Sequence, residues 1–195
     1  MNQKYETKIS KFISLVLRHN PDIIKIKLDA NGWAITDELI QGLNNHGYKV
    51  TVDDLKEIVY NDAKGRYSFS NDNTKIRANQ GHSIKVDVEL AEYKPPTYLY
   101  HGTGVKSLCE IKEHGLRPMG RLYVHLSKDY NTAIDVGKRH GTPIVLKIKS
   151  AEMHSKGFVF YQSENNVWLT NSVPVEYIEF PDSSIGNNIR GDAVI

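Results

Sequence analysis

Residues 51–78, TVDDLKEIVYNDAKGRYSFSNDNTKIRA, combine a short helical pattern with two alternating segments. Thr51 and Asp54 have the spacing of a capping box, and apolar residues then recur at helical intervals. Residues 66–70 and 75–78 alternate polar and apolar side chains on either side of a polar turn. The stretch therefore predicts a helix that leads into a β-hairpin.

Two further helices are predicted upstream of this stretch. Apolar residues at helical spacing predict a helix over residues 5–19, which Pro21 ends. A short extended segment over residues 24–28 is expected next, followed by a second helix from Thr36 to Gly47. Three helices followed by a hairpin are typical of a winged-helix unit.

The pattern changes after residues 84–97, a polar stretch that ends in two prolines. This change predicts an N-terminal lobe, residues 1–94, and a C-terminal lobe, residues 95–195. The second lobe is expected to be mostly strand with a few helices, which makes the chain an α+β protein. Its expected helices cover 106–114 and 130–139, and its expected strands 98–101, 122–126, 144–148, 158–161, 167–169 and 175–180.

The composition excludes several classes of protein. The formal charge of the chain is +2, and each predicted lobe carries +1, so binding to nucleic acid would require arginines concentrated at one site. Cys109 is the only cysteine, which excludes an internal disulfide framework and a cysteine-based zinc cluster. No apolar run approaches the ~20 residues of a membrane span, and the polar start does not resemble a signal peptide. We expect a cytoplasmic monomer.

Arg18 and His19 lie where the first helix meets Asn20-Pro21. Arginine offers a planar set of donors that matches phosphate oxygens, and histidine can move a proton near neutral pH. Basic residues at a helix C-terminus also complement the helix dipole, so the pair alone is weak evidence for a phosphate site.

His101-Gly102-Thr103-Gly104 follows a predicted strand, where a ring, a hydroxyl group and two glycines would let a nucleotide approach the backbone. Glycines after a strand also form plain turns. His125 lies in another predicted strand, where a hydrogen-bonded core histidine is the simpler interpretation. The chain lacks a Rossmann fingerprint, a P-loop, a helical zinc-protease motif and a serine-hydrolase elbow. We expect no metal.

Seven ordered segments resemble the RNA 2′-phosphotransferase family. They are Ser14–Pro21, Gly32–Ala34, Arg66–Phe69, Ile76–Ser83, Tyr100–Thr103, Arg121–Ser127 and Val167–Thr170. The match runs from about Ser10 to Ile178, and seven motifs in order are far more specific than any one of them.

The resemblance implies an enzyme that removes an internal 2′-phosphate from RNA, such as the one left at a ligated tRNA splice junction, with NAD⁺ as acceptor. It implies a winged-helix RNA-binding lobe joined to an ADP-ribosyltransferase-like lobe that binds NAD. Four residues match the family's catalytic positions: Arg18, His19, Arg66 and Arg121. The matching NAD-site positions are His101, Gly102, Thr103, His125, Ser127, Arg139 and Gly141.

Two alternatives remain open. The first is ADP-ribosyl transfer to protein or to terminal phosphates of nucleic acid. Protein modification is disfavoured, because Asn166–Leu169 is apolar where many protein-modifying relatives have a glutamate, but terminal-phosphate modification is not. The second is a DNA-binding regulator. Its recognition helix, residues 52–61, would offer only Lys56 among several acids, which argues against docking in the major groove.

Overall fold

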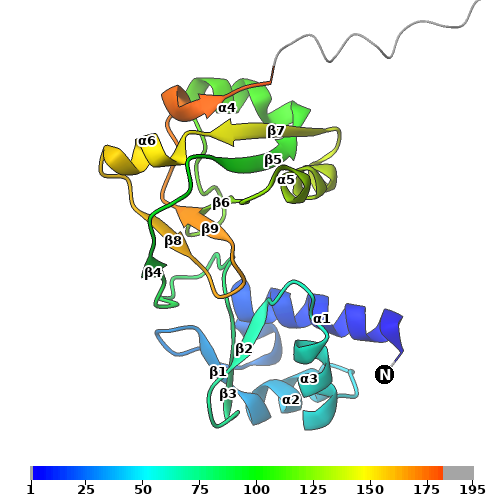
Figure 1. The fold of residues 1–195 in the computed structure, drawn as a ribbon. Coiled ribbons are helices and arrows are strands. Elements are labelled where there is room, and N and C mark those ends of the chain that lie inside the picture. Colours follow the sequence, from blue (N-terminus) through cyan, green and yellow to red (C-terminus); the bar gives the residue numbers. More distant parts are fainter. Residues whose placement is uncertain (1, 182–195) are drawn as a thin grey trace, which may run out of the picture. The chain divides into compact units, whose positions relative to one another are not determined.

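The computed structural model describes residues 2–181 (Figure 1). The described chain forms two compact units that are not contiguous in sequence. The first unit comprises residues 2–93, 117–124 and 159–171, and the second comprises residues 94–116, 125–158 and 172–181. The first division lies beside the predicted 94/95 boundary, but two later segments return to the first unit.

Backbone hydrogen bonds explain why these two segments belong to the first unit. The N–H of Leu122 donates to the carbonyl of His82 at 3.1 Å, and the N–H of Tyr93 donates to the carbonyl of Phe160 at 2.9 Å. Both contacts join residues far apart in sequence. A boundary inferred from linker composition therefore does not reveal that residues 117–124 and 159–171 belong to the first unit.

Three helices form the base of the first unit: α1 (Gln3–Arg18), α2 (Thr36–Asn45) and α3 (Val52–Tyr60). Asn2 caps α1 by accepting the N–H of Tyr5 at 2.8 Å. The capping box predicted at Thr51 and Asp54 is confirmed at the start of α3. The apolar faces of the helices meet in one core, where Ile13, Leu39 and Leu55 are completely buried.

An antiparallel sheet covers this core, with β1 (Trp33–Ile35), β2 (Tyr67–Phe69) and β3 (Lys75–Ala78) in the order β1-β3-β2. The predicted hairpin is confirmed, with Phe69 opposite Ile76. The extended segment predicted over residues 24–28 is wrong at residues 24 and 25. A 3-10 helix, Pro21–Ile24, precedes Lys25, whose φ of 58° interrupts an extended backbone.

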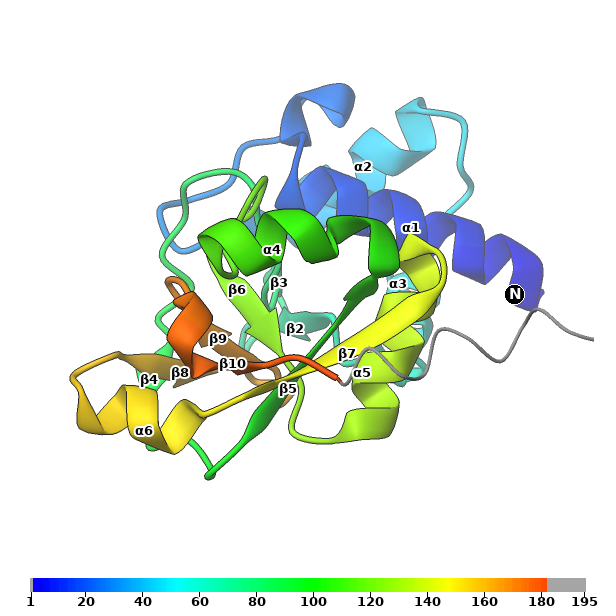
Figure 2. The same ribbon diagram turned by 90° about the horizontal axis from the view of Figure 1, so that it is seen from above.

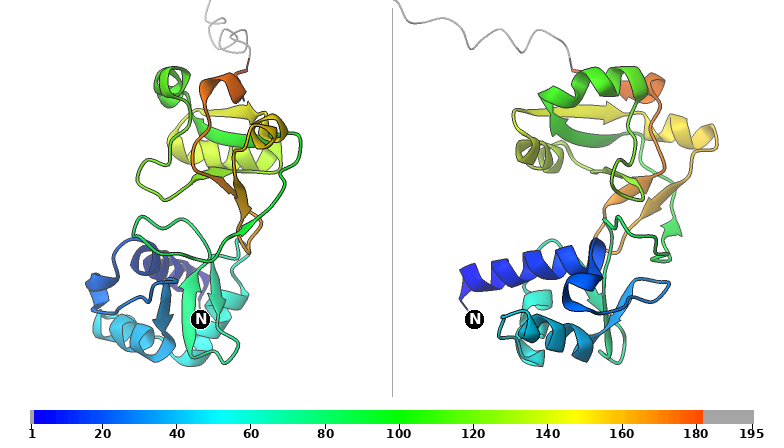
Figure 3. Two further views of the ribbon diagram at one scale, coloured as in Figure 1. Left: turned by 90° about the vertical axis from the view of Figure 1, so that its left-hand side faces the viewer. Right: turned by 180° about the vertical axis from the view of Figure 1, so that it is seen from behind.

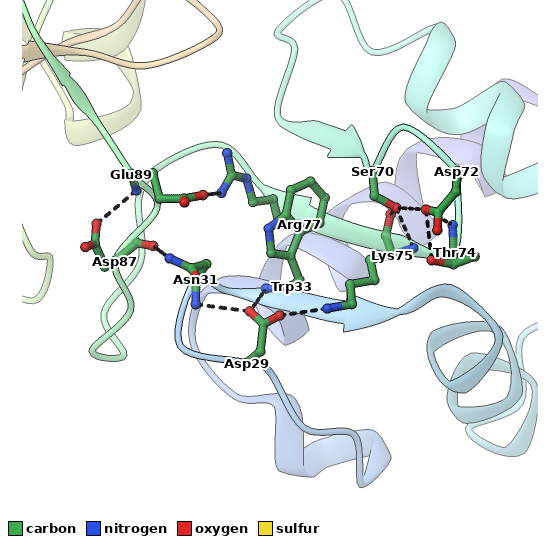
Figure 4. A network of polar contacts seen from close by, with 10 residues as sticks. All are labelled: Asp29, Asn31, Trp33, Ser70, Asp72, Thr74, Lys75, Arg77, Asp87 and Glu89. Carbon is green, nitrogen blue, oxygen red and sulfur yellow. Dashed lines mark hydrogen bonds and ion pairs between the residues drawn. The ribbon is translucent and has the colours of Figure 1, made fainter.

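Side-chain contacts tie the hairpin to the loop before β1 (Figure 4). The carboxylate of Asp29 accepts the backbone N–H groups of Asn31 and Trp33 and forms an ion pair with Lys75 at 3.1 Å. Asp72 accepts hydrogen bonds from Ser70 and from the backbone N–H of Thr74 inside the hairpin turn. These local bonds fix the turn and the register of the sheet.

A second sheet of the chain has the order β4-β8-β9-β6. Its strands are β4 (Ala91–Glu92), β8 (Phe160–Gln162), β9 (Trp168–Thr170) and β6 (Val124–Leu126). Strand β6 carries the chain from the first unit to the second, because Val124 belongs to the first and His125 to the second.

The second unit contains an antiparallel sheet of order β10-β7-β5, formed by β5 (Leu99–Gly104), β7 (Pro143–Ile148) and β10 (Ile178–Glu179). Helix α5 (Tyr130–Gly137) lies along β5 and β7 (Figure 2). A Cβ at Gly102 would lie 1.7 Å from the carbonyl oxygen of Ala133, so this close packing requires glycine.

Shorter helices complete the second unit: α4 (Leu108–His114), α6 (Ser150–Ser155), and the 3-10 helices Val105–Ser107, Lys138–His140 and Val175–Tyr177. The strand predicted over residues 175–180 is therefore only partly right, since a 3-10 helix takes its first half. The α+β class is confirmed by the helices and antiparallel sheets of the described chain.

Candidate active site

Arg18 is the last residue of α1, and its side chain is half-buried. The Nε and Nη2 atoms of Arg18 are shielded from solvent and have no hydrogen-bond partner in the described chain. Gly81, at φ +88°, lies against the guanidinium, since a Cβ there would be 3.6 Å from Nη1. A buried cation without an acid partner is costly, and a bound anion would remove that cost.

Two other arginines share the surroundings of Arg18. Burial lowers the pKa of Arg18, Tyr67 and Asp62 counteract that effect, and the charges of Arg66 and Arg121 lower the pKa further. Since arginine keeps its charge in proteins, these interactions indicate excess positive charge rather than a neutral side chain. The first unit thus brings together three of the four residues predicted to be catalytic.

His19, the fourth, follows Arg18 at the C-cap of α1 and is exposed. Its Nδ1 lies 2.9 Å from the hydroxyl of Ser83, and the backbone N–H of Ser83 donates to the carbonyl of Arg18 at 3.0 Å. Burial lowers the pKa of His19, and the charges of Arg18 and Arg121 lower it further. Both effects favour the neutral form of the His19 ring.

Sequence reasoning assigned no role to Ser83, although it belongs to one of the seven segments. The contact that gives it a role joins residues 64 positions apart. A serine next to a helix end in sequence is a recognisable capping signal, but a serine that reaches a distant histidine leaves no local pattern.

Arg66 is held in place by an acid. Its Nη1 donates to Asp62 Oδ1 at 2.6 Å and to the hydroxyl of Ser10 at 3.3 Å, and its backbone N–H donates to Asp62 Oδ2. The side chain keeps 28% of its surface exposed. Arg66 is thus both oriented by Asp62 and accessible to solvent.

Arg121 belongs to the first unit, whereas the sequence boundary had assigned it to the second lobe. Its backbone N–H donates to the carbonyl of Pro118 at 3.1 Å. The backbone N–H of the next residue, Leu122, donates to the carbonyl of His82. Arg121 is exposed. Long-range contacts therefore unite four predicted catalytic residues that the sequence boundary divides.

The predicted NAD-site residues all lie in the second unit. The Nδ1 of His101 is 3.0 Å from the carbonyl oxygen of His125. Because a carbonyl oxygen only accepts, Nδ1 carries a proton and donates it to this carbonyl, which orients the ring. Ser127 exchanges backbone hydrogen bonds with Tyr100, which brings it beside β5.

Gly102 and Thr103 are buried in β5, and the packing of α5 already accounts for glycine at residue 102. Arg139 and Gly141 are exposed. The 3-10 helix that contains Arg139 packs on the end of β5, where a Cβ at Gly104 would lie 2.2 Å from the carbonyl oxygen of His140. The structure thus gathers these residues along one strand, and a role in binding NAD stays a prediction.

Residues 4–172 match the family model described as RNA 2′-phosphotransferase, Tpt1/KptA family. The chain belongs to the RNA 2′-phosphotransferase family. Members of this family are transferases, and the protein is accordingly an enzyme.

Curated members of the RNA 2′-phosphotransferase family resemble the chain over nearly its whole length. A probable RNA 2′-phosphotransferase of Flavobacterium johnsoniae is 51% identical over 92% of this chain and 99% of its own. Those of Nostoc punctiforme and Acaryochloris marina are 49% and 48% identical, covering 92% and 87% of this chain and 99% and 93% of their own.

Two further findings concern metal ligands and membrane-spanning helices in the described residues. Within residues 2–181, no group of three or more His, Cys, Asp or Glu side chains is placed to hold a metal ion. In the same range, no helix combines the length and the apolar character needed to cross a membrane.

Proposed function

We propose that this protein is an NAD⁺-dependent enzyme that removes an internal 2′-phosphate from RNA of the kind left at a tRNA splice junction. The products are RNA with a 2′-hydroxyl, nicotinamide and ADP-ribose 1″,2″-cyclic phosphate. The observation that carries the proposal is Arg18, whose partnerless nitrogens share a neighbourhood with Arg66 and Arg121. A dianionic phosphate monoester matches such a cluster in charge and in geometry.

In the first step, a 2′-phosphate oxygen attacks C1″ of the nicotinamide ribose. The C1″–N bond breaks, and nicotinamide leaves as a neutral molecule. The phosphate oxygen is already anionic, so it needs no general base. The chain therefore has to hold and orient NAD⁺. His101, Thr103 and Ser127 suit this positioning role, since their ring and hydroxyl groups can hydrogen-bond the dinucleotide. The other proposed NAD residues are Gly102, His125, Arg139 and Gly141.

In the second step, the ribose 2″-hydroxyl attacks phosphorus, and the bond from phosphorus to the RNA 2′-oxygen breaks. The 2″-hydroxyl loses a proton, and the leaving 2′-oxygen gains one. Arg18, Arg66 and Arg121 would stabilise the negative charge that develops on the phosphoryl oxygens. His19 is the group best suited to transfer the proton, since an imidazole can both accept and donate one and Ser83 orients this ring.

The architecture fits a division of labour within the chain. The first unit, with three helices and a hairpin, would act as a winged-helix RNA-binding lobe. The second unit would act as an ADP-ribosyltransferase-like lobe that binds NAD. The strand β9 has Trp168, Leu169 and Thr170 and no glutamate, which disfavours transfer to protein side chains.

A second candidate reaction is ADP-ribosyl transfer to a terminal phosphate of nucleic acid. The same excess of arginine would receive a terminal phosphate monoester, and the first step alone would then be the whole reaction. This reaction leaves the phosphate on the nucleic acid and forms no cyclic phosphate.

The test is incubation with NAD⁺ and a short RNA bearing one internal 2′-phosphate, with mass analysis of RNA and nucleotide products. We expect loss of the phosphate together with nicotinamide and ADP-ribose 1″,2″-cyclic phosphate. A parallel reaction with a 5′-phosphorylated RNA distinguishes the second candidate, whose product keeps phosphate and ADP-ribose. An unchanged 2′-phosphate RNA, with a folded protein that binds NAD⁺, would contradict the proposal.

A further inference from the structure

Helix α1 presents an exposed stripe of lysines that leads toward Arg18. Lys4, Lys8 and Lys11 recur at intervals of four and three residues, so they share one face of the helix. All three side chains are exposed, as is Leu15 one turn further on. Figure 3 shows α1 along its full length, in blue, from the N-terminal label to its other end. We call Lys4, Lys8 and Lys11 the lysine stripe.

The part of the chain that the structure describes offers no acid that neutralises the lysine stripe. None of its three members forms an ion pair in the described chain, and Glu6 is the one acidic residue of α1. Glu6 lies on the opposite side of the helix from Lys4 and Lys11, because residues two and five positions apart point in different directions. A surface of this kind attracts a polyanion more strongly than the overall charge of +2 suggests.

Aromatic rings flank the lysine stripe. The ring of Phe12 stacks on His46 at 4.8 Å between centroids and contacts Tyr48 at 5.0 Å. The Nζ of Lys8 lies 5.6 Å from the centre of the Tyr48 ring. Lysines beside aromatic rings are the combination used for single-stranded nucleic acid, since the lysines contact phosphates while the rings stack on bases.

We propose that the lysine stripe and the adjoining His46 and Tyr48 rings bind the single-stranded RNA that flanks the 2′-phosphate. This inference rests on the proposed function, because it takes Arg18 as the phosphate contact. In an ideal helix, Lys11 lies about 10 Å and Lys4 about 21 Å along the axis from Arg18. A strand held at Arg18 and running along α1 would thus pass each lysine in turn.

The test compares two variants of equal charge. In the stripe variant, Lys4, Lys8 and Lys11 are changed to Gln. In the control variant, Lys25, Lys27 and Lys56 are changed to Gln, because they too are exposed, lie in the first unit and form no ion pair in the described chain. Binding is followed by fluorescence anisotropy of a labelled single-stranded RNA of about 12 nucleotides without a 2′-phosphate.

We expect the stripe variant to weaken RNA binding about tenfold at 0.1 M salt, and to lower the slope of log affinity against log salt by about 2, as three lost phosphate contacts require. The control variant should change the affinity less than about twofold. His46→Ala should weaken binding by a smaller, severalfold amount while it leaves the salt slope unchanged. Equal weakening by both triple variants would show attraction by overall charge and overturn the proposal.

Catalysis separates this inference from the proposed function. With a dinucleotide that bears a 2′-phosphate, the stripe variant should keep the kcat/KM of the unaltered protein. With a longer RNA it should raise KM about tenfold and leave kcat unchanged. Stripe-dependent RNA binding without reaction at the 2′-phosphate would overturn the proposed function alone. If the protein removes the 2′-phosphate and the stripe variant binds and processes the longer RNA as the unaltered protein does, only the proposal of the RNA-binding surface is overturned.

Discussion

Two arginines of the first unit, Arg77, which is buried, and Arg18, which is half-buried, differ in what surrounds them. Arg77 is 8% exposed, and its two terminal nitrogens form ion pairs with Glu89 at 3.1 Å and Glu164 at 3.4 Å. Its guanidinium also lies over the ring of Trp33, 4.4 Å from the centroid (Figure 4). Arg18 has two partnerless nitrogens and two neighbouring arginines.

The contacts of the terminal nitrogens distinguish an arginine that is neutralised within the described chain from one that is not. The Nε atoms of both Arg18 and Arg77 lack a hydrogen-bond partner, so this atom does not distinguish the two residues. The terminal nitrogens distinguish them, because those of Arg77 form ion pairs with two glutamates. The charge of Arg77 is neutralised by ion pairs, whereas Arg18 forms no ion pair with an acid in the described chain.

The largest expected effect is that of Arg18→Gln on catalysis. We expect the rate on 2′-phosphate RNA to fall at least about 100-fold, because a donor to the developing phosphoryl charge is lost. The free energy of unfolding should change by less than about 1 kcal/mol, since no ion pair is broken. Single-turnover kinetics and urea unfolding measure the two quantities. A loss of stability by more than 2 kcal/mol with an unchanged rate would make Arg18 a structural residue.

Arg77→Met should show the opposite pattern. We expect the free energy of unfolding to fall by about 2 kcal/mol, because the variant loses two ion pairs and the contact with the Trp33 ring. The rate per folded molecule should stay within about twofold. Lys75→Met is the matched control, since its ion pair with Asp29 is about half exposed and should contribute less than about 1 kcal/mol.

His82 responds to both arginines. Burial lowers its pKa to about 4, and the charges of Arg18, His19 and Arg77 contribute. Between pH 6.5 and about 4 the unfolded chain binds a proton that the folded chain does not, so stability should fall as the pH falls through that window. The loss should be on the order of 2 kcal/mol and absent in His82→Gln, as urea unfolding at several pH values would measure.

The same histidine also compares the two arginines directly. Arg18→Gln should raise the pKa of His82 more than Arg77→Met does, because the charge of Arg18 has the larger effect on it. Titration of the ring by NMR measures both shifts. Equal shifts of the His82 pKa in the two variants would mean that Arg18 and Arg77 act on His82 equally, which would contradict the difference between them.

Ser83→Ala should have the smallest effect. The loss of one hydrogen bond to His19 should lower kcat about fivefold with little change in KM, and Ser83→Thr should restore it. Ser155→Ala is a suitable control, since its exposed hydroxyl donates only to a carbonyl of its own helix. An unchanged kcat in Ser83→Ala would show that His19 needs no orienting partner.

Local signals in the sequence predicted much of this fold. The capping box at Thr51 and the hairpin over residues 66–78 depend on residues a few positions apart, and both are present. The prediction of an extended segment over residues 24–28 was wrong at residues 24 and 25. Ile24 ends a 3-10 helix, and Lys25 takes a left-handed conformation, which a lysine rarely adopts and no local sequence pattern indicates.

The candidate site was predictable in its residues but not in its organisation. Arg18 and His19 stand out because they end a helix, and the family resemblance supplied Arg66 and Arg121. The assignment of Arg121 to the first unit and the contact between His19 and Ser83 depend on contacts between distant residues. The same is true of the glutamates that neutralise Arg77, one of which lies 87 positions away.

Arg18 is the proposed binding site for a phosphate on RNA. Isothermal titration calorimetry can test it in the absence of NAD⁺, with two dinucleotides that differ only in a 2′-phosphate or a 2′-hydroxyl. We predict that the unaltered protein binds the phosphorylated dinucleotide at least about tenfold more tightly, and that Arg18→Gln abolishes this preference. Equal binding of the two dinucleotides by the unaltered protein, or an undiminished preference in the variant, would contradict the claim.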